Sequence, residues 1–404
     1  MIDIAATRAQ FPALRREVGD HQASYLDGPG GSQVPISVIQ AMDRVLSDGV
    51  SNLTPLFAAG RAAIRATNQA RRAVADLLGA ASPDAIVFGQ NMTSLTFAFS
   101  RAIARTWSAG DHIIVTALDH DANRTPWVLA AEDRGVQVTE VPFDTETFTL
   151  DPQSVADAIT PRTRLVAVTY ASNALGTLVD VSAITTAAHA AGALVYVDAV
   201  HYAPHGLIDV GAIGCDFLAV SAYKFFGPHT GMVYGRPELL ESLDAYKVRP
   251  SPASGPAKWE TGTQSFESLA GVSAAVDYLS SLGEGETRRV KLAAGYAAIG
   301  EHERMLGARF LDGVSAIDRI QLYGISTMDG RVPTFTIDVA GMSARDVAAH
   351  LGKQGIFVWD GHYYAVGVME SLGLFGSGGL VRIGFLHYTS VDEVDRLLEA
   401  LSTL

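Results

Sequence analysis

A lysine and an aspartate in the middle of the chain have the side chains that aldehyde chemistry requires. Lys224 lies in the run Ser-Ala-Tyr-Lys-Phe-Phe-Gly-Pro, where apolar and aromatic neighbours can lower the pKa of its amine by desolvation. A neutral amine can form a Schiff base with an aldehyde. Asp198 can hold a pyridine nitrogen in its protonated form, and the positive ring then acts as an electron sink.

Three further residues complete this chemistry. His120 offers a flat ring that can stack on an aromatic cofactor. Thr93, at a predicted helix start, and Ser221, close to Lys224, offer hydroxyl and backbone N–H donors for a phosphate. Together these roles describe pyridoxal phosphate (PLP). Each residue taken singly also has an ordinary structural explanation, because an Asp after a strand is commonly a turn residue and a Lys is commonly a solvated surface charge.

The elements that must position these residues follow from the hydrophobic pattern. Short runs rich in β-branched residues, mostly separated by amphipathic segments long enough for a helix, begin near Ile86, Ile113, Val136, Leu165, Leu194, Phe217 and Met232. This alternation predicts an α/β fold with a mostly parallel seven-stranded sheet and flanking helices.

Polar side chains follow five of the predicted strands. In an open parallel sheet, ligands bind beyond the carboxyl ends of the strands, where helix N-termini point their free N–H groups. The residues that share this edge are Asn91, Met92 and Thr93, then His120, Asn173, Asp198 with His201, and Ser221 with Lys224. Their joint placement favours a site at this edge over five unrelated turn residues.

The rest of the chain predicts additional helices and a second, smaller unit. Helices are expected over residues 35–48, with Ile39 and Leu46 on one apolar face, over 57–78, and as one long segment over 269–311. Further on, strands at 334–339 and 381–385 alternate with a helix opened by Ser343 and a closing helix with a capping box of Ser390 and Glu393. We predict an N-terminal segment over residues 1–20 that packs on the small domain, a large domain over 21–285 and a small C-terminal α/β domain over 286–404.

Composition excludes several classes of function. The 404 residues include 30 Lys and Arg against 43 Asp and Glu, a net charge of −13 that repels nucleic acid. The single cysteine, Cys215, cannot form an internal disulfide or a Cys-rich metal site, and the spacing of the histidines does not indicate a metal site. Without an uncharged stretch of about 18 residues, a membrane span is not expected. We therefore expect a soluble, cytoplasmic enzyme without a metal.

Several ordered motifs resemble the class-V aminotransferases, most closely the cysteine desulfurase-like branch of the fold-type I PLP enzymes. The similarity runs from about Tyr25 to the C-terminus. The motifs are Tyr25-Leu26-Asp27, Asp119-His120-Asp121-Ala122-Asn123, Ser172-Asn173-Ala174-Leu175-Gly176-Thr177, Tyr196-Val197-Asp198-Ala199-Val200-His201, Ser221-Ala222-Tyr223-Lys224-Phe225-Phe226-Gly227-Pro228, Glu260-Thr261-Gly262-Thr263 and Val381-Arg382-Ile383-Gly384. Such a set at compatible spacing is far more specific than any single motif.

The resemblance implies a role for each of these residues. Lys224 would form the internal aldimine with PLP, Asp198 would pair with the pyridinium and His120 would stack over the ring. His201 stands where desulfurases have a Gln near the ring oxygen, and Asn173 matches the Asn beside it. The phosphate would be held by Thr93 and Ser221 together with the position of Met92, and by Thr263 from a second subunit, which implies a homodimer. Arg382 would form a fork on the substrate carboxylate.

The departures from the family pattern concern the substrate. Desulfurases have a nucleophilic Cys in a His-His-Cys-Ala motif, whereas the corresponding run here is Gly361-His362-Tyr363-Tyr364-Ala365, and a phenol cannot take up sulfur as a persulfide. Cys215 begins a predicted strand, at the opposite end from the site, and is interpreted as a structural thiol. Tyr223 stands in place of the usual His before the Schiff-base Lys, and Met92 in place of the first phosphate-loop hydroxyl.

Three functions remain open at this point. The leading hypothesis is a PLP-dependent aminotransferase acting on an amino acid, with the freed Lys224 amine as the base that moves the α-proton. A carbon-sulfur lyase or an epimerase would use the same early chemistry and needs no Cys nucleophile. A non-catalytic relative that binds a partner protein is the third, although such a scaffold has no physical need for both Asp198 and Arg382.

Overall fold

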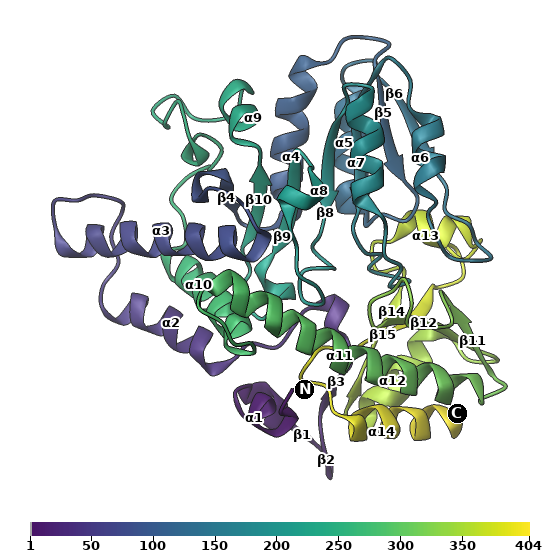
Figure 1. The fold of residues 1–404 in the computed structure, drawn as a ribbon. Coiled ribbons are helices and arrows are strands. Elements are labelled where there is room, and N and C mark those ends of the chain that lie inside the picture. The colour runs from purple at the N-terminus through teal and green to yellow at the C-terminus, as the bar shows by residue number, and fades with distance from the viewer. Residues whose placement is uncertain (1) are drawn as a thin grey trace.

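The computed structural model of the chain describes residues 2–404 and contains the predicted sheet (Figure 1). Its strand order is β4-β10-β9-β8-β7-β5-β6; β10 is antiparallel to both its neighbours, and the remaining pairs are parallel. The strands are β4 (Ile86–Gly89), β5 (His112–Thr116), β6 (Gln137–Val141), β7 (Thr163–Thr169), β8 (Leu194–Asp198), β9 (Phe217–Ser221) and β10 (Gly231–Gly235). The fold-type I expectation of a mostly parallel seven-stranded sheet is confirmed.

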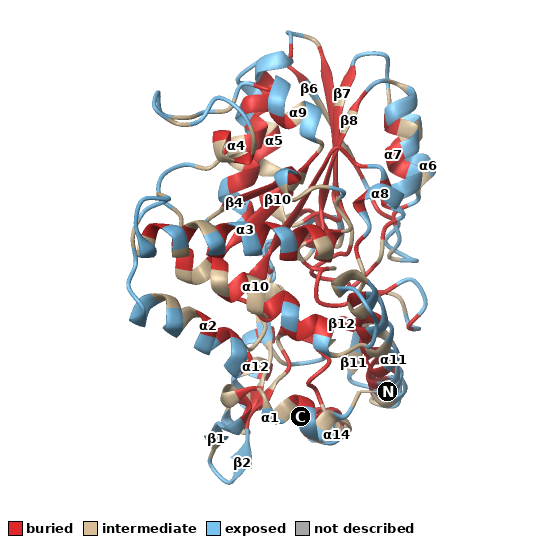
Figure 2. Ribbon diagram, turned by 60° about the vertical axis from the view of Figure 1, so that its left-hand side comes forward, coloured by how far each residue is buried: buried red, intermediate tan, exposed pale blue. Residues whose placement is uncertain are grey.

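Alternation along the strands divides the core into two layers, because successive side chains point to opposite faces of a sheet. In β9, Phe217 and Ala219 join one buried cluster, whereas Leu218 and Val220 join the other. The central strands are therefore buried on both faces, as Figure 2 shows. One face is covered by α4 (Met92–Ile103) and α5 (Thr125–Glu132), and the other by α3 (Ala58–Leu78), α7 (Val181–Ala190) and α10 (Phe266–Ser281).

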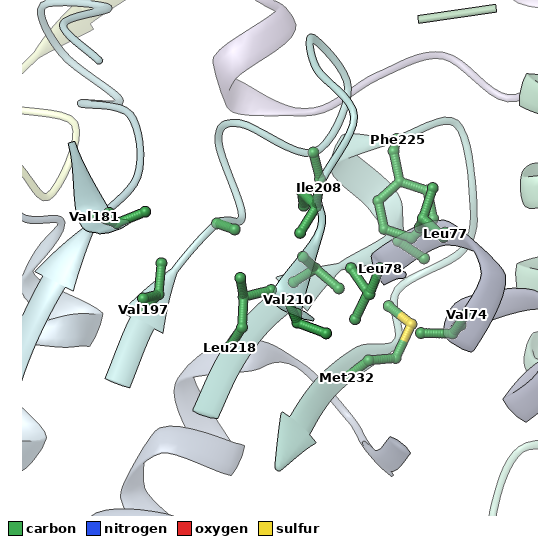
Figure 3. Close-up of a cluster of buried hydrophobic side chains, with 14 of the residues drawn as sticks. Val74, Leu77, Leu78, Val181, Val197, Ile208, Val210, Leu218, Phe225 and Met232 are labelled. Atoms are coloured by element: carbon green, nitrogen blue, oxygen red, sulfur yellow. The ribbon is translucent and has the colours of Figure 1, made fainter. Parts of the chain in front are cut away.

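Part of the second layer supports the segment that contains Lys224. Figure 3 shows buried side chains that converge from α3, β8, β9 and β10, among them Leu77, Val197, Leu218 and Met232. Phe225, which directly follows Lys224, lies in this cluster and is fully buried. The apolar core thus fixes the backbone next to the reactive amine.

The other helices between residues 36 and 242 complete this part of the chain. They are α2 (Ile36–Ser47), α6 (Pro152–Ala158), α8 (Val210–Ile213) and α9 (Pro237–Ser242). The apolar face predicted for α2 is not buried, because Ile39 is 44% exposed and Leu46 is 58% exposed. This helix lies at the edge of the molecule, away from the sheet (Figure 1).

The long helix predicted over residues 269–311 is wrong as a single element. The structure has two helices here, α10 and α11 (Arg288–Ser315). The break has a local cause: Gly285 has φ 154°, and the Thr287 side chain accepts a hydrogen bond from the backbone N–H of Val290, which starts a new helix. Helix-forming residues on both sides of this break made the sequence pattern resemble one continuous helix.

A second sheet of four antiparallel strands lies beyond α11, in the order β11-β12-β15-β14. Its elements are β11 (Ile320–Tyr323), β12 (Thr334–Val339), α12 (Ala344–Lys353), β14 (Trp359–Gly361), α13 (Val366–Ser371), β15 (Leu380–Gly384) and α14 (Val391–Ser402). The Ser343 cap of α12 and the capping box of Ser390 and Glu393 are confirmed.

The N-terminal residues contact both halves of the chain. Their elements are α1 (Ile4–Ala9), the hairpin of β1 (Glu17–Val18) and β2 (His21–Gln22), and β3 (Ser24–Tyr25), which pairs with β13 (Ile356–Phe357). Arg8 donates to Glu393 at 2.6 Å, while Phe11 packs on both Phe226 and Tyr388. The domain boundaries at residues 20 and 285 stay a prediction. Among residues 2–404, each helix is too short or too polar to cross a bilayer.

Candidate active site

The predicted edge of the sheet is where the candidate residues lie. Asp198 is the last residue of β8 and Ser221 the last of β9, while Met92 begins the helix that follows β4. A hydrogen bond of 3.1 Å from the Met92 N–H to the Ser221 hydroxyl joins two of these strand ends. Gly231 permits the approach, because a Cβ at this position would lie 2.2 Å from the Asn91 carbonyl carbon.

Lys224 ends a short 3-10 helix, Ala222–Lys224, directly after β9. Its amine is partly buried, donates a hydrogen bond to the Pro29 carbonyl and lies 4.6 Å from the centre of the Tyr223 ring. Desolvation, and secondarily the positive charge of Arg382, lower the pKa of this amine to about 7. A substantial fraction of Lys224 is therefore neutral and nucleophilic near neutral pH.

Asp198 is 5% exposed, and its carboxylate accepts a hydrogen bond of 2.9 Å from the Val200 N–H. Burial raises its pKa to about 6, while the Val200 hydrogen bond and the charge of Lys224 act in the opposite direction. A second carboxyl group, that of Asp119, lies close by and is fully enclosed by Thr116 and Asn123, which both donate to it. Burial raises the pKa of Asp119 well above its usual range, and the charge of Asp198 acts in the same direction.

The start of α4 presents donors suited to an anion. Asn91 caps this helix by accepting a hydrogen bond of 2.8 Å from the Ser94 N–H, while Thr93 is exposed in the first turn. The Ser221 hydroxyl, which is 2% exposed, accepts the Met92 N–H and keeps its own proton for another acceptor. Helix N-termini of this kind bind phosphate.

His120 and His201 are both held in the neutral state. The Nδ1 atom of His120 accepts a hydrogen bond of 3.0 Å from the Ala122 N–H, and burial together with the charges of Lys224 and Arg382 lowers its pKa to about 3. His201 is 6% exposed, its Nε2 atom lies 3.0 Å from the Thr334 hydroxyl, and burial lowers its pKa well below the usual range. Both rings therefore offer neutral faces.

Arg382 reaches the site from β15 and is 4% exposed. It donates to the Asn173 carbonyl at 3.2 Å and to the Asp27 carboxylate at 3.1 Å, while its Nε atom is buried without a partner. The Asn173 side chain donates to the Tyr363 carbonyl at 2.9 Å, and its own oxygen is also unpartnered. Arg382 and Asn173 thus each keep one buried polar atom, a donor and an acceptor respectively, without a partner.

Sequence reasoning missed two pairs of polar side chains near the candidate residues, one an ion pair and one a hydrogen-bonded histidine and glutamate. Asp27 belongs to a quoted motif but had no assigned role, and it pairs with Arg382 across 355 positions of sequence. His205 pairs with Glu303 at 2.8 Å, with both side chains 3% exposed, and the His205 ring packs edge-on against His201 at 5.3 Å. Neither pair has a local sequence signal, because its members lie on distant elements.

Thr263 and Cys215 do not join the other residues in this chain. Thr263 lies in the exposed segment ahead of α10, and its predicted contact with the cofactor of a second subunit stays a prediction. Cys215 precedes β9, whereas Ser221 and Lys224 follow the other end of that strand. The thiol is 1% exposed, and burial raises its pKa to about 12. It is therefore a protonated, enclosed side chain.

The donor set fits PLP on the evidence of these atoms alone. A partly buried amine of lowered pKa suits an aldehyde, and a buried carboxylate near it suits a pyridinium nitrogen. Neutral His120 provides a ring, and the start of α4 with Ser221 provides a phosphate cradle. The aldehyde, the pyridine nitrogen, the ring and the phosphate of the cofactor each have a chemically matching group at one sheet edge.

Comparison with known proteins identifies the class. The model of the family "Aminotransferase class-V" matches residues 24–397, and the chain belongs to this family. It is accordingly a PLP-dependent enzyme of the cysteine desulfurase-like branch.

The similar proteins cover almost the whole chain. A probable cysteine desulfurase of Pseudomonas aeruginosa is 31% identical over 98% of this chain and 96% of its own length. One of Vibrio cholerae is 31% identical over 99% of this chain and 98% of its own. The structure of a cysteine desulfurase from Escherichia coli matches with a TM-score of 0.86 at 27% identity, covering 100% of this chain and 98% of that one.

Proposed function

We propose that the protein is a PLP-dependent lyase that removes a sulfur substituent from the β-carbon of an amino acid. One observation supports this over the aminotransferase that the sequence first suggested, and a second supports direct elimination over desulfuration through an enzyme thiol. The similar proteins are named cysteine desulfurases, and the candidate site contains no thiol, because the only cysteine of the chain lies at the other end of β9. Direct elimination needs no nucleophilic cysteine, whereas sulfur transfer to an enzyme thiol does.

The observation that carries the proposal is the Lys224 amine, with its pKa lowered to about 7, at the same sheet edge as Asp198, which Arg382 approaches from β15 of the second sheet. Bound PLP supplies an electron sink for the bonds at the α-carbon of an amino acid. Lys224 would hold the cofactor and then, as a neutral amine, accept the α-proton at its Nζ atom. Burial disfavours charge on this amine, which helps it to pass the proton on.

The other candidate residues would bind and orient. Asp198 would face the pyridine nitrogen, His120 would cover the ring, and His201 with Asn173 would lie near the ring oxygen. Ser221, Thr93 and the Met92 backbone would hold the phosphate. Arg382 would bind the substrate carboxylate with its unpartnered Nε and a free terminal N–H, a bidentate arrangement that suits a carboxylate.

The balanced reaction for cysteine consumes water and gives pyruvate, ammonia and sulfide. The test is to incubate the PLP-loaded protein with cysteine and related amino acids, and to quantify pyruvate and sulfide together. We expect the two products in equal amounts, and none from Lys224→Ala, which removes the base. Sulfide without pyruvate, or product formation by Lys224→Ala equal to that of the unmodified protein, would contradict the proposal.

Amino-group transfer is the second candidate, favoured by the family match and by Arg382. Adding a 2-oxo acid to the same incubation distinguishes it, because a new amino acid would appear and sulfide would not. An epimerase would instead convert an L-amino acid to its D-form with no loss of amino acid. The non-catalytic reading is set aside, since the chain is an enzyme of this family.

We also propose a homodimer formed through α2 and the segment that follows it. Large apolar side chains are exposed here, including Leu46 at 58%, Leu56 at 85% and Phe57 at 50%. A hollow of about 350 Å³ between α2, α3 and α10 adjoins this patch. Exposed apolar patches of this kind mark association surfaces. Sedimentation should give the mass of two chains, and a monomer at micromolar concentration would count against the dimer.

A further inference from the structure

The loop 361–365, which lies where desulfurases have their nucleophile, contains two strained residues in succession. Tyr363 has φ 53° and Tyr364 has φ 57°, in the left-handed region that bulky side chains rarely adopt. Such conformations persist only where the surrounding structure imposes them, and they concentrate at functional sites. The contacts of the loop therefore indicate what the strain maintains.

Hydrogen bonds accepted by two backbone carbonyls of this loop join it to two strand-end segments of the large sheet. The Tyr364 carbonyl accepts the Asp121 N–H at 2.7 Å, and the Tyr363 carbonyl accepts the Asn173 side chain at 2.9 Å. Both carbonyls therefore hold segments that contain candidate residues, the one next to His120 and the one that contains Asn173. Close packing fixes the loop from behind, since a Cβ on Gly379 would lie 2.2 Å from the Gly361 backbone.

The Tyr364 side chain makes a different contact. Its ring stacks on that of His120, with centres 5.6 Å apart and planes inclined by 19°. The ring also meets that of His362 edge-on, with centres 5.7 Å apart, but Tyr364 is 65% exposed and within residues 2–404 its hydroxyl makes no hydrogen bond. The contact with His120 is thus made by the aromatic face and not by the phenol oxygen.

We propose that Tyr364 is a positioning residue, whose ring holds the plane of His120 in the orientation needed to cover PLP. This rests on the proposed role of His120. In this chain the loop that bears a nucleophile in desulfurases is a fixed clamp: its carbonyls hold Asp121 and Asn173, and its exposed ring supports the histidine. The backbone of Tyr363 and Tyr364 is strained, and the hydrogen bonds of the two carbonyls together with the stack on His120 maintain this conformation.

The test compares Tyr364→Ala, Tyr364→Phe and a control, Phe375→Ala. Phe375 is also an exposed aromatic residue, at 50%, and it contacts His362 but not His120. The readouts are the apparent dissociation constant of PLP and the visible circular dichroism of bound PLP, which reports how the ring is held. Aromatic stacks of this kind predict a loss of about threefold to tenfold in PLP affinity for Tyr364→Ala, with a weakened dichroic band.

Tyr364→Phe should retain both signals, because the stack needs only the ring, and Phe375→Ala should match the unmodified protein. Equal behaviour of Tyr364→Ala and Phe375→Ala would overturn the proposal, as would a Tyr364→Phe variant as defective as Tyr364→Ala. A His120→Ala variant tests the proposed role of His120 separately from that of Tyr364. If it binds PLP with unchanged affinity and dichroism, the proposed role of His120 fails, whatever Tyr364 does.

Discussion

The amine of Lys224 is partly buried beside a permanent cation, and its pKa of about 7 lies more than three units below the usual value near 10.4. The neutral amine, which reacts with an aldehyde, is the minor form below pH 7 and the major form above it. Burial is the first cause of this shift and Arg382 the second.

We predict that the rate at which PLP couples to the cofactor-free protein rises with pH, reaches half its maximum near pH 7 and levels off above it. Stopped-flow absorbance at constant ionic strength measures this profile. Arg382→Gln should move the midpoint upward, because removal of the nearby positive charge raises the Lys224 pKa. A midpoint near pH 10 in the unmodified protein would show that the amine is not desolvated.

Residue types and their order along the chain were sufficient to nominate Lys224, Asp198 and Ser221, since each follows a recognisable strand. Partners that lie far away in sequence were not predictable in this way. Asp27 meets Arg382, and Tyr364 meets His120, only because separate elements converge. Neither the positive φ of Tyr363 nor that of Tyr364 has a signal in residue type, because aromatic residues normally avoid that region.

One hydroxyl links the first turn of α4 to the end of β9. This is the hydroxyl of Ser221, the last residue of β9, which accepts a hydrogen bond from the Met92 N–H. Ser221→Ala would remove this acceptor and also the hydroxyl that we propose as a donor to the phosphate of PLP. Hydrogen bonds to charged groups contribute about 1.5–3 kcal/mol, so we expect PLP affinity to fall at least tenfold. Equilibrium titration of the cofactor-free protein with PLP measures the effect.

Ser100→Ala is the matched control for that substitution. Ser100 is a buried serine of the same helix, and its hydroxyl donates only to the Phe97 carbonyl one turn earlier. Its removal should change PLP affinity by no more than about twofold. The lost hydrogen bond contributes about 1 kcal/mol to the free energy of unfolding and does not involve PLP. Equal losses of affinity in both variants would mean that α4 stability, and not the Ser221 hydroxyl, governs binding.

Strands were easier to predict than helix boundaries for a physical reason. Each buried parallel strand is a short, dense apolar run, and all seven predicted runs became strands of one sheet. The stretch around Gly283 and Gly285 instead lies between two good helix-forming segments, and two glycines were insufficient to reveal the break. The exposed face of α2 also follows the helical period, so periodicity alone did not show that it would remain uncovered.

Phe11 connects distant parts of the molecule. It is fully buried and packs against Phe226, which lies two residues after Lys224, and against Tyr278 and Tyr388 from α10 and the approach to α14. Phe11→Ala should lower the free energy of unfolding by about 3–5 kcal/mol, because it opens a cavity among rigid aromatic rings. Urea denaturation followed by fluorescence and circular dichroism measures the change.

Leu129→Ala on α5 provides the comparison, because Leu129 is 45% exposed and its truncation leaves no cavity. It should change stability by about 0.5 kcal/mol or less. A similarly small effect for Phe11→Ala would mean that the N-terminal segment rests loosely on the remainder of the chain. The sequence predicted a packed segment over residues 1–20, but its aromatic contacts with Phe226, Tyr278 and Tyr388 arise only in three dimensions.

The buried thiol of Cys215, just before β9, can report on opening of the folded protein. A colourless disulfide reagent that releases a yellow thiolate on reaction can reach Cys215 only when the surrounding sheet opens, since this side chain is 1% exposed. Because the 404 residues include one cysteine, each protein molecule can release at most one yellow thiolate. Under native conditions, the rate at which the yellow absorbance increases would therefore measure how often the structure around Cys215 opens spontaneously. The measurement needs no label and no engineered probe.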